Sequence, residues 1–235
     1  MLNNRTALVT GSTQGIGLAI AETLKATYGV RAAYIRANLA LAHEASELVA
    51  QASHVLGALD ILVNNAGIQH TCGIESFPVD RWDAILAVNL SAAFHSMKSV
   101  VPTMRTRGWG RIVYIASVHG LVASINKGAY LAAKHGLVGL SKGVALETAT
   151  QGITVNCICP GWTDTAIIQP QIDLRSAKFG GDRAAGIRDL LREKQPNQTL
   201  LPPERIGEVV AFLCSESAGG ITGVALPVDD DWTAQ

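Results

Sequence analysis

Residues 111–134 read RIVYIASVHGLVASINKGAYLAAK, and the rest of the chain is organised around this stretch. The apolar run 111–116 predicts a buried strand that ends at Ser117. A loop follows, and then a helix on which Tyr130 and Lys134 are four residues apart, so both side chains lie on one face. The stretch therefore predicts a phenol beside an ammonium, close to the carboxyl end of a strand.

This pair can carry acid/base chemistry if the pKa of the phenol falls. An unperturbed phenol has a pKa of about 10, and a cation about 4 Å away can lower it by roughly two to three units. Tyr130 would then exchange a proton with an alcohol or carbonyl oxygen, while Ser117 hydrogen-bonds the same oxygen. The alternative is a half-buried helix with a satisfied tyrosine and a solvated lysine, because this spacing also recurs by chance.

Composition indicates a compact, rather apolar domain and does not favour a nucleic-acid or membrane-surface protein. The 235 residues fit one α/β domain, residues 1–235, of which 48% are hydrophobic and 16% charged. A net charge of zero and a pI of about 7.0 give no reason to expect nucleic acid or an anionic membrane as partner. Some of the apolar surface is expected to meet other subunits.

The ends of the chain and its cysteines predict a cytoplasmic protein. A strand begins within a few residues of Met1, and no apolar run reaches the roughly 18 residues that span a bilayer, so we expect no leader and no anchor. The cysteines lack C-x-x-C spacing, so we interpret them as small reduced core residues and expect no metal site. They are Cys72, Cys157, Cys159 and Cys214.

A glycine-rich turn follows the first predicted strand. The run 5–10 is apolar and β-rich, and Gly11-Ser-Thr-Gln-Gly15-Ile-Gly17 leads from it into a helical pattern. Glycines let the backbone turn sharply at a helix N-terminus, where free N–H groups and the helix dipole attract a pyrophosphate. The spacing differs from the G-x-G-x-x-G of other dinucleotide folds, and a turn without a ligand is the alternative.

The remaining pattern alternates strands and helices, with one insertion. Strands are predicted at 30–36, 59–63, 153–158 and 223–228, and helices at 41–56, from near Val79, and from about 202 to 213. Asn64-Asn65-Ala66-Gly67 follows one strand, where small and amide side chains let a flat ligand approach. Residues 167–195 are predicted to form a polar helical insertion, broken at Gly180-Gly181, that covers the site.

These motifs occur in one chain and in one order, and together they resemble the classical short-chain dehydrogenase/reductase family. The resemblance implies a Rossmann-like doubly wound parallel sheet that binds a nicotinamide dinucleotide at the carboxyl edge of its strands. It implies four catalytic residues, Asn89, Ser117, Tyr130 and Lys134. It implies cofactor contacts from Gly11, Ser12, Thr13, Gly15, Ile16, Gly17, Asn38, Asn65, Ala66, Gly67, Tyr130, Lys134, Pro160, Gly161 and Thr165.

The resemblance also assigns roles. Tyr130 is expected to be the general acid/base, and Lys134 to hold the nicotinamide ribose and lower the pKa of Tyr130. Ser117 is expected to orient the substrate oxygen. Asn89 would place a water that links Lys134 to solvent, and Thr165 would lie near the nicotinamide amide. The hydride chemistry belongs to the cofactor.

Further motifs are similar to the branch of the family that interconverts (R)-3-hydroxybutyrate and acetoacetate. They include NNAGIQH at 64–70, SVHG at 117–120, ICPGW at 158–162 and WTAQ at 232–235. By this resemblance an amide, imidazole and ammonium cluster holds the substrate carboxylate, and a tryptophan forms a wall of the pocket. The implied substrate contacts are Gln69, Ser117, His119, Lys127, Tyr130, Trp162 and Gln171.

The chain departs from the family pattern after its first helix, where one strand and one helix are missing. The junction lies near Leu24 and Lys25. Either the chain is short and the strand 30–36 pairs with the first strand through a right-handed crossover, or residues are absent from the numbering. A Leu24–Lys25 Cα separation far from 3.8 Å would indicate the second.

The missing unit bears on the cofactor, which we expect to be NAD. If the strand 30–36 takes the position of the missing strand, Arg36 near its end would favour a ribose 2′-phosphate and hence NADP. Asn38 replaces an acidic residue that the family has beside the adenine, and Asp230-Asp231 stand where glycines are common. A homotetramer is expected by resemblance. The alternatives are a reductase of another 3-hydroxy acid or ketone, and a non-catalytic nucleotide-binding protein.

Overall fold

A parallel sheet forms the centre of the molecule. The computed structural model describes residues 5–29 and 33–234, and in them the sheet has five strands in the order β1-β2-β3-β4-β5. Every neighbouring pair of strands is parallel. The strands are β1 (Ala7–Val9), β2 (Ile61–Asn64), β3 (Gly110–Ile115), β4 (Ile153–Pro160) and β5 (Ala225–Val228).

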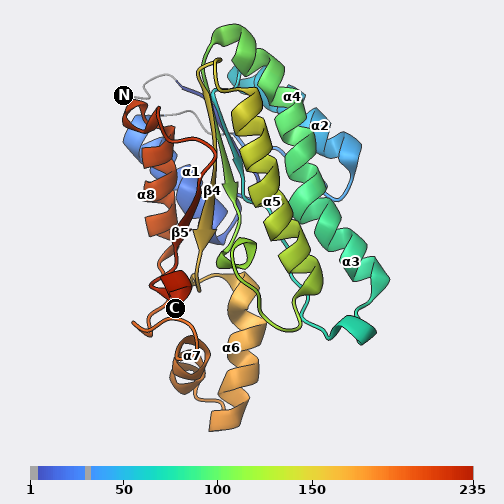
Figure 1. The fold of residues 1–235 in the computed structure, drawn as a ribbon, viewed down its shortest axis with the longest axis vertical. Coiled ribbons are helices and arrows are strands. Elements are labelled where there is room, and N and C mark those ends of the chain that lie inside the picture. The colour runs from blue at the N-terminus through green and yellow to red at the C-terminus, as the bar shows by residue number, and fades with distance from the viewer. Residues whose placement is uncertain (1–4, 30–32, 235) are drawn as a thin grey trace.

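Helices cover both faces of the sheet (Figure 1). On one face α1 packs against α8, and on the other α2 packs against α4, beside α5. The fold is therefore the doubly wound α/β arrangement that the motifs predicted. The covering helices are α1 (Gly15–Tyr28), α2 (Ala42–Leu56), α3 (Val79–Leu86), α4 (Ala92–Arg107), α5 (Gly128–Glu147) and α8 (Pro203–Cys214).

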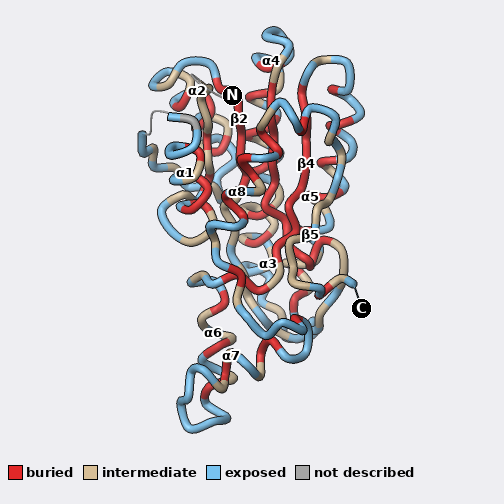
Figure 2. The backbone as a smooth tube through the Cα atoms, turned by 90° about the vertical axis from the view of Figure 1, so that its left-hand side faces the viewer, coloured by how far each residue is buried: buried red, intermediate tan, exposed pale blue. Residues whose placement is uncertain are grey.

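The core is split into two layers by the sheet. Side chains alternate along each strand, so Leu62 and Ile112 face the α4 layer while Val63 and Val113 face the α1 and α8 layer. The central strands β2, β3 and β4 are buried along their whole length, as the continuous red tube of Figure 2 shows. Burial on both faces explains why apolar residues predominate in these strands. The four cysteines are free, and all but Cys72 are buried.

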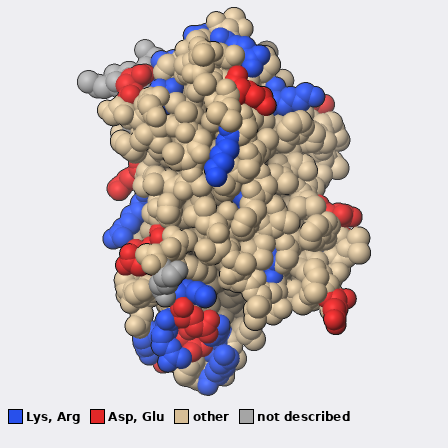
Figure 3. All heavy atoms as spheres, viewed as in Figure 1, with Lys and Arg blue, Asp and Glu red and all other residues tan. Residues whose placement is uncertain are grey.

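The insertion forms a helical hairpin beyond the carboxyl edge of the sheet (Figure 1). Its helices are α6 (Gln169–Ser176) and α7 (Arg183–Leu191). Gly180 and Gly181 between them both have positive φ, which explains the predicted break. Arg175 on α6 contacts Asp189 and Glu193, each at 2.9 Å. Figure 3 shows charged side chains of both signs gathered at this end of the molecule.

The predicted strand 30–36 does not form in the part that the structure describes. Residues 30–32 lie outside the described residues, and Ala33–Arg36 have no strand geometry. Strand β1 pairs with β2 and lies at an edge of the sheet. Ile35 packs its side chain against the core, together with Ala37 and Leu39, so the segment covers the edge without pairing with it. The expected pairing with the first strand is therefore wrong for the described residues.

Helix α1 runs through Leu24 and Lys25 without a break and ends at Gly29, which has φ +63°. The two residues are joined within one regular helix. The described chain therefore has a short second unit, without the strand pairing that the first explanation required.

Residues 79–107 form one helix that is long and apolar enough to cross a membrane by length and composition alone. Polar residues interrupt its sequence, so it contains no long unbroken apolar run. Its α4 part packs against α2, and α3 packs against α5. Core helices of soluble proteins meet the same criterion, so the observation is weak evidence for a membrane span.

Candidate active site

A cavity of about 320 Å³ opens at the carboxyl edge of the sheet. Parallel strands end together, so motifs far apart in sequence meet there. Most of the predicted residues line it. They are Gly11, Thr13, Gly15, Ile16, Asn65, Ala66, Gly67, Gln69, Ser117, His119, Lys127, Tyr130, Lys134, Pro160, Gly161, Trp162 and Thr165.

The glycine-rich turn is shaped for close backbone contact. A Cβ on Gly17 would lie 2.3 Å from the carbonyl oxygen of Gly11, and Gly11 itself has φ +63°. Asn65 Nδ2 donates to the carbonyl oxygens of Thr10 and Gly11, at 3.0 and 3.1 Å. The amide thus fixes the turn against the end of β2. The N-terminus of α1, with no acidic residue in its first turn, borders the cavity. These features fit a pyrophosphate.

The predicted catalytic residues of α5 meet Ser117 at the cavity. Ser117 follows β3 and lines the same cavity as Tyr130. Lys134 Nζ lies 5.4 Å from the centre of the Tyr130 ring and donates to the carbonyl oxygen of Ile115 at 2.7 Å. A Cβ on Gly120 would lie 2.9 Å from the carbonyl oxygen of Lys134, so this glycine allows α5 to approach the end of β3 closely.

The pKa values differ from the predicted ones. Burial raises the pKa of Tyr130 to about 12, and the hydrogen bond from Ser117 opposes this rise. Burial also lowers the pKa of Lys134 to about 8. The direction at Tyr130 is set by desolvation, which disfavours the phenolate and the ammonium alike. A lowering of the Tyr130 pKa by Lys134 stays a prediction. At pH 7 the phenol carries its proton.

Asn89 lies beside the cavity rather than in its lining. It is buried in a π-helical turn, Ala87–Ser91, between α3 and α4. Its Oδ1 accepts from the main-chain N–H of Ile68 at 2.8 Å, and its Nδ2 donates to the Ile68 carbonyl oxygen at 2.9 Å. The side chain therefore fixes the loop after Gly67. A water held by Asn89 stays a prediction.

Donors converge on the predicted carboxylate pocket. Lys127 Nζ lies 4.8 Å from the centre of the Trp162 ring, and burial lowers the pKa of this lysine to about 8. Gln171 lies outside the cavity lining, and its Nε2 donates to Gln69 Oε1 at 3.4 Å. Two buried N–H donors, Gln69 Nε2 and Trp162 Nε1, have no hydrogen-bond partner among the described residues.

His119 lies between two serines. Its Nδ1 is 3.3 Å from Ser117 Oγ, and its Nε2 is 3.0 Å from Ser124 Oγ. Burial, with the charge of Lys127 in addition, lowers the pKa of His119 to about 3. The imidazole is therefore neutral, and the structure places it against Ser117.

Three predicted cofactor residues do not line this cavity: Gly17, which packs against Gly11, and Asn38 and Ser12. Asn38 is exposed: its main-chain N–H donates to Glu44, and its side chain accepts from the Ala40 N–H at 3.1 Å, in the turn before α2. Ser12 lines a second cavity of about 260 Å³ beside β1, which shares Gly11 and Thr13 with the first. The described lining of the second cavity has no ionised side chain.

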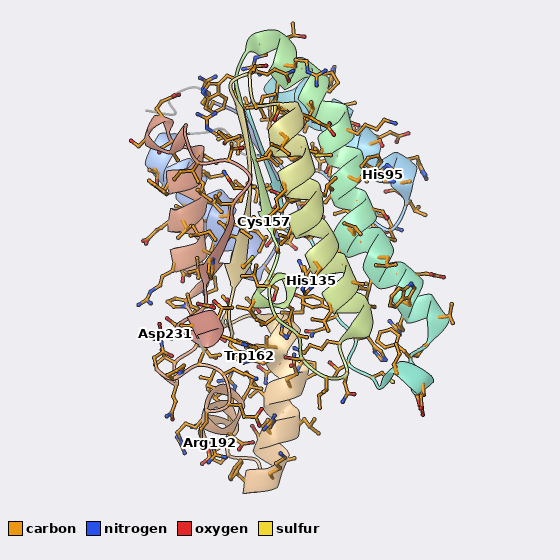
Figure 4. The ribbon with its side chains drawn as sticks, viewed as in Figure 1. His95, His135, Cys157, Trp162, Arg192 and Asp231 are labelled. Atoms are coloured by element: carbon orange, nitrogen blue, oxygen red, sulfur yellow. The ribbon has the colours of Figure 1, made fainter. Side chains whose placement is uncertain are left out.

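Trp232 also lines the cavity, although its motif did not predict a place in the site. The Trp232 ring lies 5.5 Å from that of Trp162 and 5.4 Å from that of His119. Figure 4 shows Trp162 where the sheet meets α6, near Asp231 of the C-terminal segment. Asp230 and Asp231 have φ of +48° and +69°, which explains why glycines are common there. The WTAQ motif was the only sequence signal, and it does not show where the segment folds.

Comparison with known proteins agrees with this geometry. Residues 7–233 match the family described as enoyl-(acyl carrier protein) reductase. The D-beta-hydroxybutyrate dehydrogenase of Cupriavidus necator is 45% identical over 258 aligned positions, covering all of both chains. The enzyme of the same name from Rhizobium meliloti is 41% identical, over 98% of this chain and 99% of the relative.

An alignment of 258 positions is longer than the 235 residues of this chain, so gaps open in it, as expected for a short second unit. The solved aldohexose dehydrogenase of Thermoplasma acidophilum superposes with a TM-score of 0.90 at 29% identity. It covers all of this chain and 96% of that one. The chain is therefore an oxidoreductase of the short-chain dehydrogenase/reductase family, which implies a nicotinamide cofactor.

Proposed function

We propose that the chain interconverts (R)-3-hydroxybutyrate and acetoacetate, with NAD as the hydride acceptor. One observation supports this substrate most: Lys127 and the unpartnered donors of Gln69 and Trp162 line the same cavity as Ser117 and Tyr130. A carboxylate accepts several hydrogen bonds and carries the opposite charge to Lys127, which offsets its desolvation. The relatives named D-beta-hydroxybutyrate dehydrogenase support the same choice.

The nicotinamide cofactor supplies hydride transfer when it is bound. In this chain the turn from Gly11 to Gly17 would hold the pyrophosphate, and Lys134 and Thr165 would hold the nicotinamide half. Because Tyr130 is protonated at pH 7, it is ready to donate its proton to the ketone oxygen of acetoacetate. In the opposite direction the alcohol proton passes to the phenolate. Ser117 orients the reacting oxygen in both directions.

The preference for NAD is inferred from the resemblance of the motifs. Neither Arg36 nor Asn38 is in the lining of either cavity, and the described lining beside β1 offers neither a carboxylate nor a cation to a ribose 2′ position. Initial rates with each dinucleotide test the choice. We expect NAD to give the higher kcat/KM, and a higher value with NADP would reverse the assignment.

The substrate is tested with a matched pair of compounds. We expect Lys127→Ala to lower kcat/KM for acetoacetate at least tenfold, and to change the rate on a neutral ketone of the same length much less. Equal losses on the two compounds would rule out the carboxylate pocket and favour another ketone. Lys142→Ala, on the exposed part of α5, is the control. A non-catalytic nucleotide-binding role would require no turnover of either compound.

The assembly and the compartment are further parts of the proposal. We propose a cytoplasmic homotetramer, in keeping with the family resemblance. Sedimentation of the purified protein at micromolar concentration tests the tetramer, and a monomer there would contradict it.

A further inference from the structure

The second cavity continues from the first across the glycine-rich turn. The two cavities share Gly11 and Thr13, and Ser12 between them lines the second cavity alone. A group bound at this turn therefore has one cavity on each side. The first cavity contains Ser117 and Tyr130, so it suits the reacting half of a dinucleotide. The second cavity is then the space that is left for the other half.

This second cavity lies where a further strand would extend the sheet. Strand β1 pairs with β2 on one side, and within residues 5–29 and 33–234 no strand pairs with its other side. The cavity extends along β1 from the turn as far as Ala7, with a volume of about 260 Å³. Its other walls are largely aliphatic. They include Ala21 and Leu24 of α1, Leu48, Ala52 and Leu56 of α2, and Ile35, Ala37 and Leu39 of the covering segment.

The free edge of β1 carries main-chain hydrogen-bonding groups. The Thr6 carbonyl oxygen and the Thr10 N–H both bond to the main chain of β2, at 2.9 and 3.0 Å. The main-chain groups of successive residues in a parallel strand face opposite sides, so those of Ala7 and Val9 face away from β2. Both residues line the second cavity. This edge therefore presents the carbonyl oxygen of Ala7 and, two residues later, the N–H of Val9.

Adenine matches this edge in shape and in hydrogen bonding. Its amino group donates and the adjacent ring nitrogen N1 accepts, which is the complement of a carbonyl oxygen followed by an N–H. Its flat faces are suited to the aliphatic walls. Val9 lies two residues before Gly11, about 7 Å along the strand, so a base joined to a pyrophosphate at the turn lies beside β1.

The lining also bears on the choice of dinucleotide. A ribose 2′-phosphate would bring negative charge against a described lining that has no cation, and burying an unpaired charge is costly. The same cavity therefore favours NAD over NADP without an acidic residue at the ribose.

We propose that the second cavity holds the adenosine half of NAD, with the adenine bonded edge-on to the free edge of β1 through the Ala7 carbonyl oxygen and the Val9 N–H. The base then takes the hydrogen bonds that a neighbouring strand would make. The inference rests on the proposed function for the dinucleotide and not for the ketone substrate.

Calorimetric titration of the full-length protein tests the base contacts with dinucleotides that differ only in the base. Hypoxanthine has an oxygen in place of the amino group and a hydrogen on N1, so it presents the reverse pattern to β1. We expect reduced nicotinamide hypoxanthine dinucleotide to bind the wild type at least tenfold more weakly than NADH. Equal affinities would overturn the inference.

A matched pair of variants on α2 tests the cavity itself. Ala52→Leu extends a buried wall residue into the cavity, and Ala50→Leu, on the exposed side of the same helix, is the control. We expect Ala52→Leu to lower NADH affinity at least tenfold. The affinity for reduced nicotinamide mononucleotide, which lacks the adenosine half, should stay as in the wild type. Thermal unfolding checks that both variants are folded.

Two results with these variants would overturn the inference. One is equal NADH affinity in Ala52→Leu and Ala50→Leu. The other is an equal loss of affinity for NADH and for the mononucleotide in Ala52→Leu. If Ala52→Leu does not fold, the comparison of bases in the wild type decides. If the wild type shows the expected base preference but does not reduce acetoacetate, the proposed function fails and the adenine site stands.

Discussion

Gln195 Oε1 accepts a hydrogen bond from the main-chain N–H of Trp162 at 2.5 Å. This bond joins the C-terminal end of the insertion 167–195 to the wall of the cavity. The amide is fully buried, and its Nε2 donates to the Thr199 carbonyl oxygen at 2.9 Å and to Asp230 at 3.4 Å. One side chain thus connects both ends of the insertion with the C-terminal segment. It holds Trp162 in place against Lys127.

Gln195→Met should therefore impair substrate binding more than nucleotide binding. Methionine has a similar shape but cannot replace these hydrogen bonds, so we expect a loss of about 2 kcal/mol in unfolding free energy and a KM for acetoacetate raised severalfold. NADH affinity should change less than twofold. Gln51→Met, on the exposed side of α2, is the control. An unchanged KM would show that Trp162 does not depend on Gln195.

Lys127 makes substrate binding depend on pH. Burial lowers its pKa to about 8, so the charged form is lost as the pH rises through that value. We expect the KM for the carboxylate substrate to be constant below pH 7 and to rise above pH 8, approaching tenfold per pH unit. Lys127→Arg keeps its charge in this range, so its KM should stay flat. A wild-type KM that is flat to pH 9.5 would contradict this role of the ammonium.

The amino ends of the strands lie away from the site, and Asp60 there allows a separate test of stability. Asp60 is buried and accepts from Arg5 at 3.1 Å, from Arg107, and from the main-chain N–H of Thr6 at 2.9 Å. Asp60→Ala leaves these donors without their acceptor, and we expect a loss of about 3 kcal/mol in urea unfolding. The activity per folded molecule should not change. Asp80→Ala, at an exposed pair, should stay within about 0.5 kcal/mol of the wild type.

Gly17→Ala tests whether the glycine-rich turn from Gly11 to Gly17 binds the dinucleotide. The added Cβ would lie 2.3 Å from the Gly11 carbonyl oxygen, so the turn must move. We expect NADH affinity, measured by fluorescence titration, to fall at least tenfold. Gly139→Ala on α5 meets no atom within 4 Å and should bind NADH as the wild type does. Equal affinities in the two variants would place the dinucleotide elsewhere.

The sequence predicted the fold and the meeting of its motifs because parallel strands end at one edge, and Asn65, Ser117 and Gly161 each follow a strand. Its strand prediction for 30–36 is wrong in the described part, 33–36, because an apolar run also fits a segment such as Ala33–Ala37 that covers a sheet edge without pairing. Trp232 and Gln195 could not be placed, since their contacts depend on how the insertion and the C-terminal segment fold back. The pKa direction at Tyr130 depended on burial, which helical spacing does not reveal.

The central claim is that Tyr130 carries the proton in the proposed reaction. It is tested most directly by initial rates with (R)-3-hydroxybutyrate and NAD, and with NADP in parallel, for the wild type and Tyr130→Phe. Lys142→Ala, on the exposed part of α5, is the control. We predict that Tyr130→Phe lowers kcat by 10²- to 10⁴-fold, roughly the size of a general acid/base contribution, while Lys142→Ala leaves it unchanged. A Tyr130→Phe enzyme that turns over at the wild-type rate would contradict the account.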